Sequence, residues 1–218
     1  MRLLAQYSLI CFILFSVTSC VRIKKWTKKT FPQATELNDY QSQIKKYRGT
    51  VKLYEFFQTK AQFDVIWLSD DVREAYSEMH CRKHGKTGED EGNVLKRQLE
   101  RNNFYISFYV LCLRNSTIGK KKSKWSVYLD VDGKKTTVKD VEQVDLPPEY
   151  QELFGKKFNK FKTPVLVKFN ISDRDGNFVL NPNSKNLKLV FNSPGLEGSI
   201  EWELDREGRV VKRSINKK

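Results

Sequence analysis

The chain has 218 residues, with 40 Lys and Arg against 26 Asp and Glu, a formal charge of +14 at pH 7. This length suffices for one sizeable domain and is short for two. The basic excess predicts contact with anionic matter, such as lipid headgroups, wall polymers, lipopolysaccharide or nucleic acid.

Residues 1–19 have the three-part order of an export signal. Arg2 provides a positive start, residues 3–17 carry no charge, and Thr18 and Ser19 are the small residues that a signal peptidase needs. A permanent transmembrane helix needs about 20 apolar residues, and this run is shorter and diluted by polar side chains. We therefore expect cleavage directly before Cys20.

The cleavage region Val17-Thr18-Ser19-Cys20 resembles the lipobox of bacterial lipoproteins. The resemblance implies that Cys20 becomes the first residue of the mature chain and carries acyl chains, palmitate among them. It also implies a lipid anchor in the cell envelope, outside the cytoplasm. Val21 after the cysteine favours the outer membrane if the host has two membranes. The alternative is an ordinary secretory signal with a chance cysteine.

Residues 20–48 have the composition of a lipidated basic tether. Five basic residues stand within ten residues of Cys20, and Trp26 lies among them. The five are Arg22, Lys24, Lys25, Lys28 and Lys29. Each cation near an anionic membrane surface contributes about 1 kcal/mol of binding. Without residues 1–19 the chain keeps 39 basic and 26 acidic residues, a charge of +13. Export argues against nucleic acid, so the expected partners are the membrane, an envelope protein or an anionic polymer. A solvated basic linker is the alternative for this segment.

From residue 49 to 218 the dominant pattern is two-residue alternation of apolar and polar side chains. It is strongest over 104–112, 125–131, 165–171 and 200–204, and shorter candidates are 51–57, 63–68, 136–139, 187–191 and 210–212. Such alternation is typical of strands with one buried and one wet face, as in antiparallel sheets. The sequence thus predicts a mainly β domain, an antiparallel β-sandwich that is immunoglobulin-like or similar.

The turn residues agree with this architecture. Asp132-Gly133 separates two strand candidates and is the strongest short-range hairpin signal. Asp175-Gly176 and Glu207-Gly208 predict further turns. The run 173–177 has two Asp residues two apart, as in a calcium loop, but it lacks the closing Glu, so a plain β-turn is predicted.

Residues 70–102 lack alternation and predict a helical insertion between two strands. Asp71 and Glu74 fit a capping box at the start of a first helix. Its apolar stripe is Val72, Ala75, Tyr76 and Met79. Gly85 is expected to end this helix, residues 86–93 to form a loop, and Val94, Leu95 and Leu99 to mark a second, short helix.

The chain has two histidines, His80 and His84, four residues apart on the first predicted helix. That spacing places both on one helix face, as in many zinc sites. Glu78 or an acidic residue of 89–91 would have to complete such a site, while Arg82, Lys83 and Lys86 would repel a dication. A polar helix end is therefore the favoured interpretation, and a metal site is the alternative.

Two cysteines other than Cys20 follow the predicted signal, namely Cys81 and Cys112. In an oxidising compartment they could form one disulfide. Two separately buried thiols are an equal alternative, because cysteine is among the most buried residue types.

The densest basic patch in the body is Lys120, Lys121, Lys122 and Lys124, in a predicted loop. It is a candidate site for an anion or partner, against the alternative of a solvated connection between strands. We find no nucleophile elbow, no Gly-rich phosphate loop and no CxxC motif, so no catalytic residue and no cofactor is predicted. The favoured function is a non-enzymatic binding or structural module of the envelope. The alternatives are a cell-envelope hydrolase and a metal-binding protein.

Overall fold

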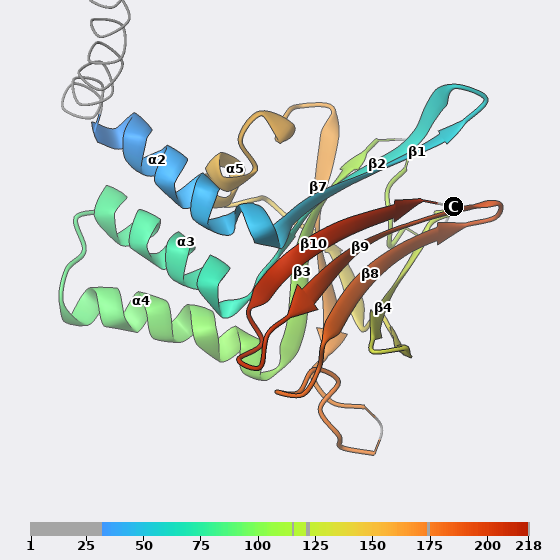
Figure 1. Ribbon diagram of the computed structural model, residues 1–218. Helices are drawn as coiled ribbons and strands as arrows, with labels where there is room; N and C mark the ends of the chain where they lie inside the picture. The colour runs from blue at the N-terminus through green and yellow to red at the C-terminus, as the bar shows by residue number, and fades with distance from the viewer. Residues whose placement is uncertain (1–31, 115, 121–122, 174, 218) are drawn as a thin grey trace, which may run out of the picture. The chain divides into compact units, whose positions relative to one another are not determined.

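The computed structural model describes residues 32–217, except 115, 121–122 and 174 (Figure 1). The predicted signal and the lipidation site at Cys20 lie outside the described residues. Residue contacts divide the chain into two compact units, 1–42 and 43–218. The described part of the first unit belongs to helix α2 (Pro32–Gln43), within the segment 20–48 for which the sequence predicts a lipidated basic tether. Pro32 stands at its first position, where proline's missing N–H leaves no hydrogen bond unmade.

The folded body begins before the boundary at residue 49 that the sequence predicts. Ile44 and Tyr47 start and end the 3₁₀ turn η1 (Ile44–Tyr47), and both side chains are buried. Residues three apart share one face of a 3₁₀ turn, so this turn packs as part of the body. Lys45 and Lys46 between them give the segment the composition of a solvated linker and obscure its buried face.

Two antiparallel five-stranded sheets make up most of the body and confirm the predicted mainly β, sandwich-like architecture (Figure 1). The first sheet has the order β1 (Arg48–Glu55), β2 (Gln58–Trp67), β3 (Tyr105–Leu113), β7 (Lys162–Asn170), β6 (Asp140–Gln143). The second has the order β10 (Val210–Lys217), β9 (Leu196–Leu204), β8 (Asn186–Ser193), β4 (Ser126–Val131), β5 (Lys134–Thr137). The chain passes from the first sheet to the second after β3, returns for β6 and β7, and ends in the second sheet, so neither sheet is a separate segment of the chain.

Aromatic side chains fill the space between the two sheets. Trp67 and Phe108 of the first sheet contact Trp202 of the second, with ring centroids 5.9 and 5.8 Å apart. Phe63 stacks on Phe191 across the same interior at 4.2 Å. All five rings are buried, and burying a large apolar side chain contributes roughly 1.5–3 kcal/mol. The alternation in the sequence therefore identified the inward face of these strands correctly.

The two sheets approach each other closely where β1 faces β9. A methyl group added at Gly198 would lie 2.5 Å from Val51 Cγ1, and one added at Gly49 would lie 2.7 Å from Ile200 Cδ1. Atoms at these distances overlap, so both strands need glycine at the crossing point. The first strand of the body thus lies against one of its last two strands.

Helices cover the outer face of the first sheet. Helices α3 (Asp70–Lys83) and α4 (Glu89–Glu100) and the 3₁₀ turn η2 (Arg101–Asn103) connect β2 to β3, and α5 (Pro148–Phe154) and η3 (Gly155–Lys157) connect β6 to β7. Tyr109, on the opposite face of β3 from Phe108, packs on Tyr150 of α5 at 4.7 Å. Tyr150 in turn stacks on Tyr76 of α3 at 4.5 Å. Strand β3 is therefore buried on both faces, where one wet face was predicted.

The predicted helical insertion at 70–102 is confirmed, with differences at the helix ends. The stripe Val72, Ala75, Tyr76 and Met79 is buried as expected. The cap position is Ser69 rather than Asp71, and Asp71 accepts a hydrogen bond from the Tyr47 hydroxyl instead of capping the helix. Helix α4 begins at Glu89, inside the predicted loop. None of the helices among the described residues has the length and apolar character to cross a membrane.

In two hairpins among the described residues, both residues of a two-residue turn have positive φ angles. Asp132 and Gly133 join β4 to β5 with φ of 49° and 88°, which confirms the predicted turn. Phe56 and Phe57 join β1 to β2 with φ of 47° and 64°, although the sequence predicts strand through residue 57. The two Phe side chains are fully exposed, at 88% and 104%. A large side chain is strained in this conformation, and such turns usually contain Gly, Asn or Asp. The two Phe residues therefore gave no sign of a turn in the sequence.

Candidate functional site

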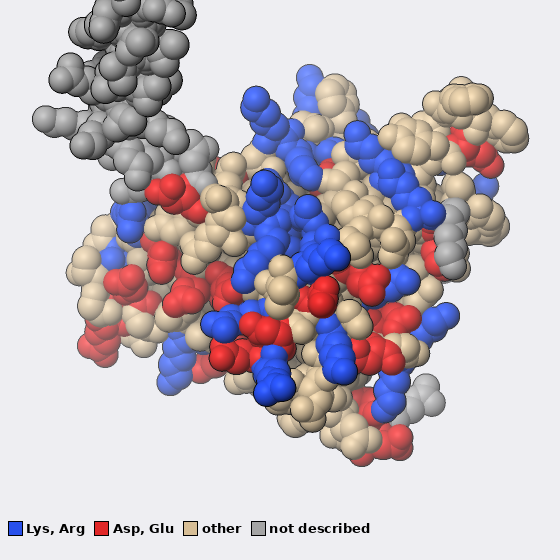
Figure 2. All heavy atoms as spheres, in the orientation of Figure 1, with Lys and Arg blue, Asp and Glu red and all other residues tan. Residues whose placement is uncertain are grey.

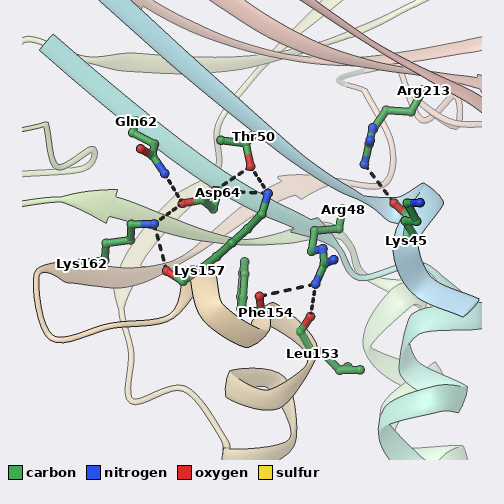
Figure 3. A network of polar contacts seen from close by, with 10 residues as sticks. All are labelled: Lys45, Arg48, Thr50, Gln62, Asp64, Leu153, Phe154, Lys157, Lys162 and Arg213. Atoms are coloured by element: carbon green, nitrogen blue, oxygen red, sulfur yellow. Dashed lines mark hydrogen bonds and ion pairs between the residues drawn. The ribbon is translucent and has the colours of Figure 1, made fainter. Parts of the chain in front are cut away.

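Two lysines contact one buried carboxylate on the outer side of the first sheet, and two arginines lie nearby (Figure 3). We call this set, Arg48, Lys157, Lys162, Arg213 and Asp64, the cationic cluster. Its members come from β1, η3, β7, β10 and β2, which are far apart in the sequence. Figure 2 shows Lys and Arg side chains grouped near the middle of one face of the molecule.

Asp64 is the only acidic member of the cluster, and its hydrogen-bonding capacity is taken up. Its side chain is fully buried and accepts hydrogen bonds from Lys162 Nζ at 2.5 Å, Thr50 Oγ1 at 2.6 Å and Gln62 Nε2 at 2.9 Å. Burial raises the pKa of this carboxyl, but the hydrogen bonds outweigh burial and hold the pKa below its ordinary value. Lys157 Nζ lies farther away, 3.5 Å from Oδ1.

The two arginines are fixed in place by backbone carbonyl groups. Arg48 Nη1 donates to the carbonyl oxygen of Leu153 at 2.7 Å, and Arg213 Nη1 donates to that of Lys45 at 2.9 Å. Among the described residues these contacts use only one nitrogen of each guanidinium. A guanidinium carries five N–H donors, so most of each group's donors remain for a ligand.

Burial and neighbouring positive charges disfavour the charged forms of two cluster cations, Arg48 and Lys157. Burial, and next the charge of Arg213, lower the pKa of Arg48. Burial also lowers the pKa of Lys157, with Arg48 and Arg213 adding to the shift and Asp64 opposing it. A lowered pKa of a cation means that its surroundings disfavour the charged form. A bound anion would relieve this repulsion, which makes the cluster a candidate anion-binding site.

The basic loop that the sequence singled out is less completely defined. Lys121 and Lys122 lie outside the described residues, and Lys120 and Lys124 are exposed in the connection between β3 and β4. The Ser123 hydroxyl there donates to the carbonyl oxygen of Thr117 at 2.6 Å and organises the turn. A run of neighbouring lysines in the sequence therefore pointed to this loop. The cationic cluster has no such run, because its members come from separate strands and from η3.

His80 and His84 lie side by side on α3 and face Glu149 of α5. His80 Nδ1 lies 3.4 Å and His84 Nε2 3.8 Å from Glu149 Oε1. Neither Glu78 nor the acidic run 89–91, which the sequence suggested as a third ligand, joins this group. Glu149 was missed because nothing in the sequence links α5 to α3.

Cys81 and Cys112 are separate buried thiols, one of the two alternatives that the sequence left open. Cys81 is on α3, which covers the outer face of the first sheet, and its pKa is raised by burial and by the nearby Glu91. Cys112 is on the inward face of β3, and burial raises its pKa to about 12. The two thiols thus lie in different layers of the body.

A cavity of about 330 Å³ lies between the start of α3 and the turn before β10. Its lining includes three carboxylates, each of which has a partner. Asp70 accepts from Asn102 Nδ2 at 2.6 Å, Asp71 pairs with Lys46 at 3.7 Å, and Glu207 pairs with Arg209 at 2.5 Å. The contacts of Asp70 and Asp71 link the start of α3 to η2 and to η1.

The chain matches no protein-family model, no curated protein and no solved structure. Its function is therefore inferred from the geometry of the described residues and from the motifs in its sequence.

Proposed function

We propose that this chain is a lipid-anchored protein of the bacterial cell envelope that binds a phosphate-bearing anionic polymer through the cationic cluster. The observation that carries the proposal is the excess of charge at this cluster. Lys157 and Lys162 contact one carboxylate, and the charges of Arg48 and Arg213 act on Lys157. That carboxylate already accepts hydrogen bonds from Lys162, Thr50 and Gln62.

Arginine suits this role because its planar donor fork matches the oxygens of a phosphate group. Arg48 and Arg213 are already oriented by backbone carbonyl groups, so little side-chain entropy remains to be lost on binding. The charge of +13 that remains without residues 1–19 raises the local concentration of any polyanion around this site. Membrane attachment through Cys20 would keep the protein close to envelope polymers.

Neutralising two cluster cations tests the proposed ligand class. The double variant Arg213→Gln, Lys157→Gln is expected to bind polyphosphate roughly 30-fold more weakly than the wild type, because each cation near an anionic surface contributes about 1 kcal/mol. Fluorescence anisotropy with labelled polyphosphate at two salt concentrations measures the affinity and its salt dependence.

The matched control is Lys120→Gln, Lys124→Gln, which removes the same charge from the exposed loop and is expected to change the affinity less than about threefold. An equal loss in both double variants would show that binding follows total charge and would contradict a site at the cluster. Urea denaturation of each variant checks that the fold is retained.

The anchor is tested separately, at Cys20. In the variant Cys20→Ala we expect the precursor to stay unprocessed and the protein to lose its acyl mass, because the acceptor thiol is gone. Cell fractionation and intact-mass measurement follow both changes. The variant Cys11→Ala, within the same predicted signal, is the control and should be processed normally. Normal processing and membrane retention of Cys20→Ala would refute lipidation at this residue.

A further inference from the structure

The side chains of His80, His84 and Glu149 converge on one point between α3 and α5. One ligand atom from each residue lies within 4.8 Å of the other two. Four-residue spacing puts both histidines on the same face of α3, and Glu149 stands in the first turn of α5, directly after Pro148. The group thus joins two helices that cover the same sheet.

The distances fit a small metal ion. Tetrahedral ligands at zinc bond lengths of about 2.0–2.1 Å lie roughly 3.3 Å from one another. Glu149 Oε1 lies 3.4 Å from His80 Nδ1 and 3.8 Å from His84 Nε2. The two imidazole nitrogens lie within 4.8 Å of each other, so side-chain rotations that draw them together would complete the coordination geometry.

One buried polar atom of this group lacks the hydrogen bond that burial requires. The Glu149 side chain is 3% exposed. Among the described residues, the buried His80 Nδ1 has no hydrogen bond, although the carboxylate oxygen is close. An unpaired polar atom in a buried position costs about 1–3 kcal/mol, and such an atom facing a carboxylate is explained by a ligand between them.

The surroundings fix the ligands and leave one side open. The His80 ring stacks on Tyr76 at 5.8 Å, and Tyr76 stacks on Tyr150, which orients the imidazole. Lys83, one of the cations that argued against a metal, pairs with Glu152 at 2.6 Å. Lys86 Nζ remains near, 3.4 Å from His80 Nε2. The His84 side chain is 54% exposed, so an ion can enter from that side.

We infer that His80, His84 and Glu149 form a binding site for a divalent transition-metal ion, with Zn²⁺ as its best match. Two imidazoles and one carboxylate are a ligand set that zinc prefers, and three protein ligands leave a position open to water. The site goes beyond the proposed polymer binding, since it uses none of the residues of the cationic cluster.

Titration of the purified protein with Zn²⁺ tests this site. Isothermal titration calorimetry is expected to show one equivalent of bound Zn²⁺, and the melting temperature should rise when it is added because the ion joins α3 to α5. Titration with Co²⁺ should give the visible absorption of a tetrahedral complex. Absence of any one-equivalent binding would overturn the inference.

Single variants locate the ligands. His84→Ala and Glu149→Gln are each expected to weaken Zn²⁺ binding at least about 100-fold, since loss of a second-shell partner alone costs 10–100-fold. His84 is half-exposed, so its variant should fold even if the Glu149 variant does not. Glu78→Gln, on the same helix, is the control and should bind Zn²⁺ as the wild type does. Lys86→Met should bind it several-fold more tightly, because a nearby positive charge is removed. Unchanged affinity in His84→Ala would contradict the site.

Discussion

Replacing Asp64 with Asn is expected to lower the free energy of unfolding by about 3–5 kcal/mol, because it leaves a buried lysine without its counter-charge. Asp64 is fully buried and the Lys162 side chain is 7% exposed, with 2.5 Å between Nζ and Oδ2. Urea denaturation followed by circular dichroism measures the change.

The matched control is Asp140→Asn. Asp140 pairs with Lys168 at 3.3 Å in the same sheet, but its side chain is 50% exposed, and exposed pairs contribute about 0–1 kcal/mol. Similar losses in the two variants would mean that burial of the Asp64–Lys162 pair has no special consequence. The double variant Asp64→Asn, Lys162→Met should regain part of the lost stability, because it also removes the unpaired charge.

The Asp64 pair also gives the body an expected pH dependence. Its folded-state pKa lies below the ordinary value, because hydrogen bonds from Lys162, Thr50 and Gln62 outweigh burial. A depressed carboxyl pKa contributes stability above the unfolded-state pKa of about 3.9, and that contribution is lost as the pH falls toward the folded-state pKa. The stability difference between wild type and Asp64→Asn should therefore shrink below about pH 4 and stay constant between about pH 6 and 8.

Replacing Trp202 with Ala is expected to destabilise the body by about 3–5 kcal/mol, since a large cavity would open between the sheets. The indole is fully buried against Trp67 and Phe108, and its Nε1 donates to the carbonyl oxygen of Lys46 at 3.1 Å. The measurement is again the free energy of unfolding in urea. A change below about 1.5 kcal/mol would show that the sheets repack around the missing ring.

Phe178→Ala is the control for this substitution. The Phe178 side chain is 64% exposed, so its removal should change the stability by less than about 0.5 kcal/mol. The variant Trp202→Phe keeps most of the apolar volume but loses the indole donor, and it should lie between the two.

The sequence predicted the strands with strong alternation, because burial on one face is visible as a period of two. Phe108 and Val110 on β3 and Ile200 and Trp202 on β9 are inward-facing as predicted. Strand β6 (Asp140–Gln143) was not predicted, because Val141 is its only apolar residue. It is an edge strand of four residues, and such strands carry little pattern.

Helix α5 was also missed, for a different reason. It is short, and its buried residues Tyr150, Leu153 and Phe154 stand three and four apart within a single stretch of seven residues. A stripe of that length is too brief to separate a helix from an irregular segment by periodicity. Its start signal is nevertheless present, since Pro148 occupies the first helical position, where proline is favoured.

The residues of the cationic cluster could not be predicted together, because the order of strands in the sheets is not written in any local pattern. Arg48 and Arg213 are 165 positions apart in the numbering and approach because β1 lies beside β10. Each looks like an ordinary surface cation in its own segment. His80 and His84 were found because their spacing is local, while their partner Glu149 depends on how α5 packs.

The contact between β1 and β9 sets an order on how the chain can fold. Val51 and Leu53 meet Gly198 across the sandwich, so β1 waits for a partner that stands 147 positions later in the chain (198 minus 51). Contacts of such long sequence separation are slow to form, because a large loop must close before they add stability. In a chain that leaves the ribosome or a translocation channel N-terminus first, the inward face of β1 would stay uncovered until the β9–β10 hairpin emerges. Until then the two sheets cannot close on each other at β1. A chain cut before residue 196 would leave the apolar face of β1 uncovered and prone to aggregation.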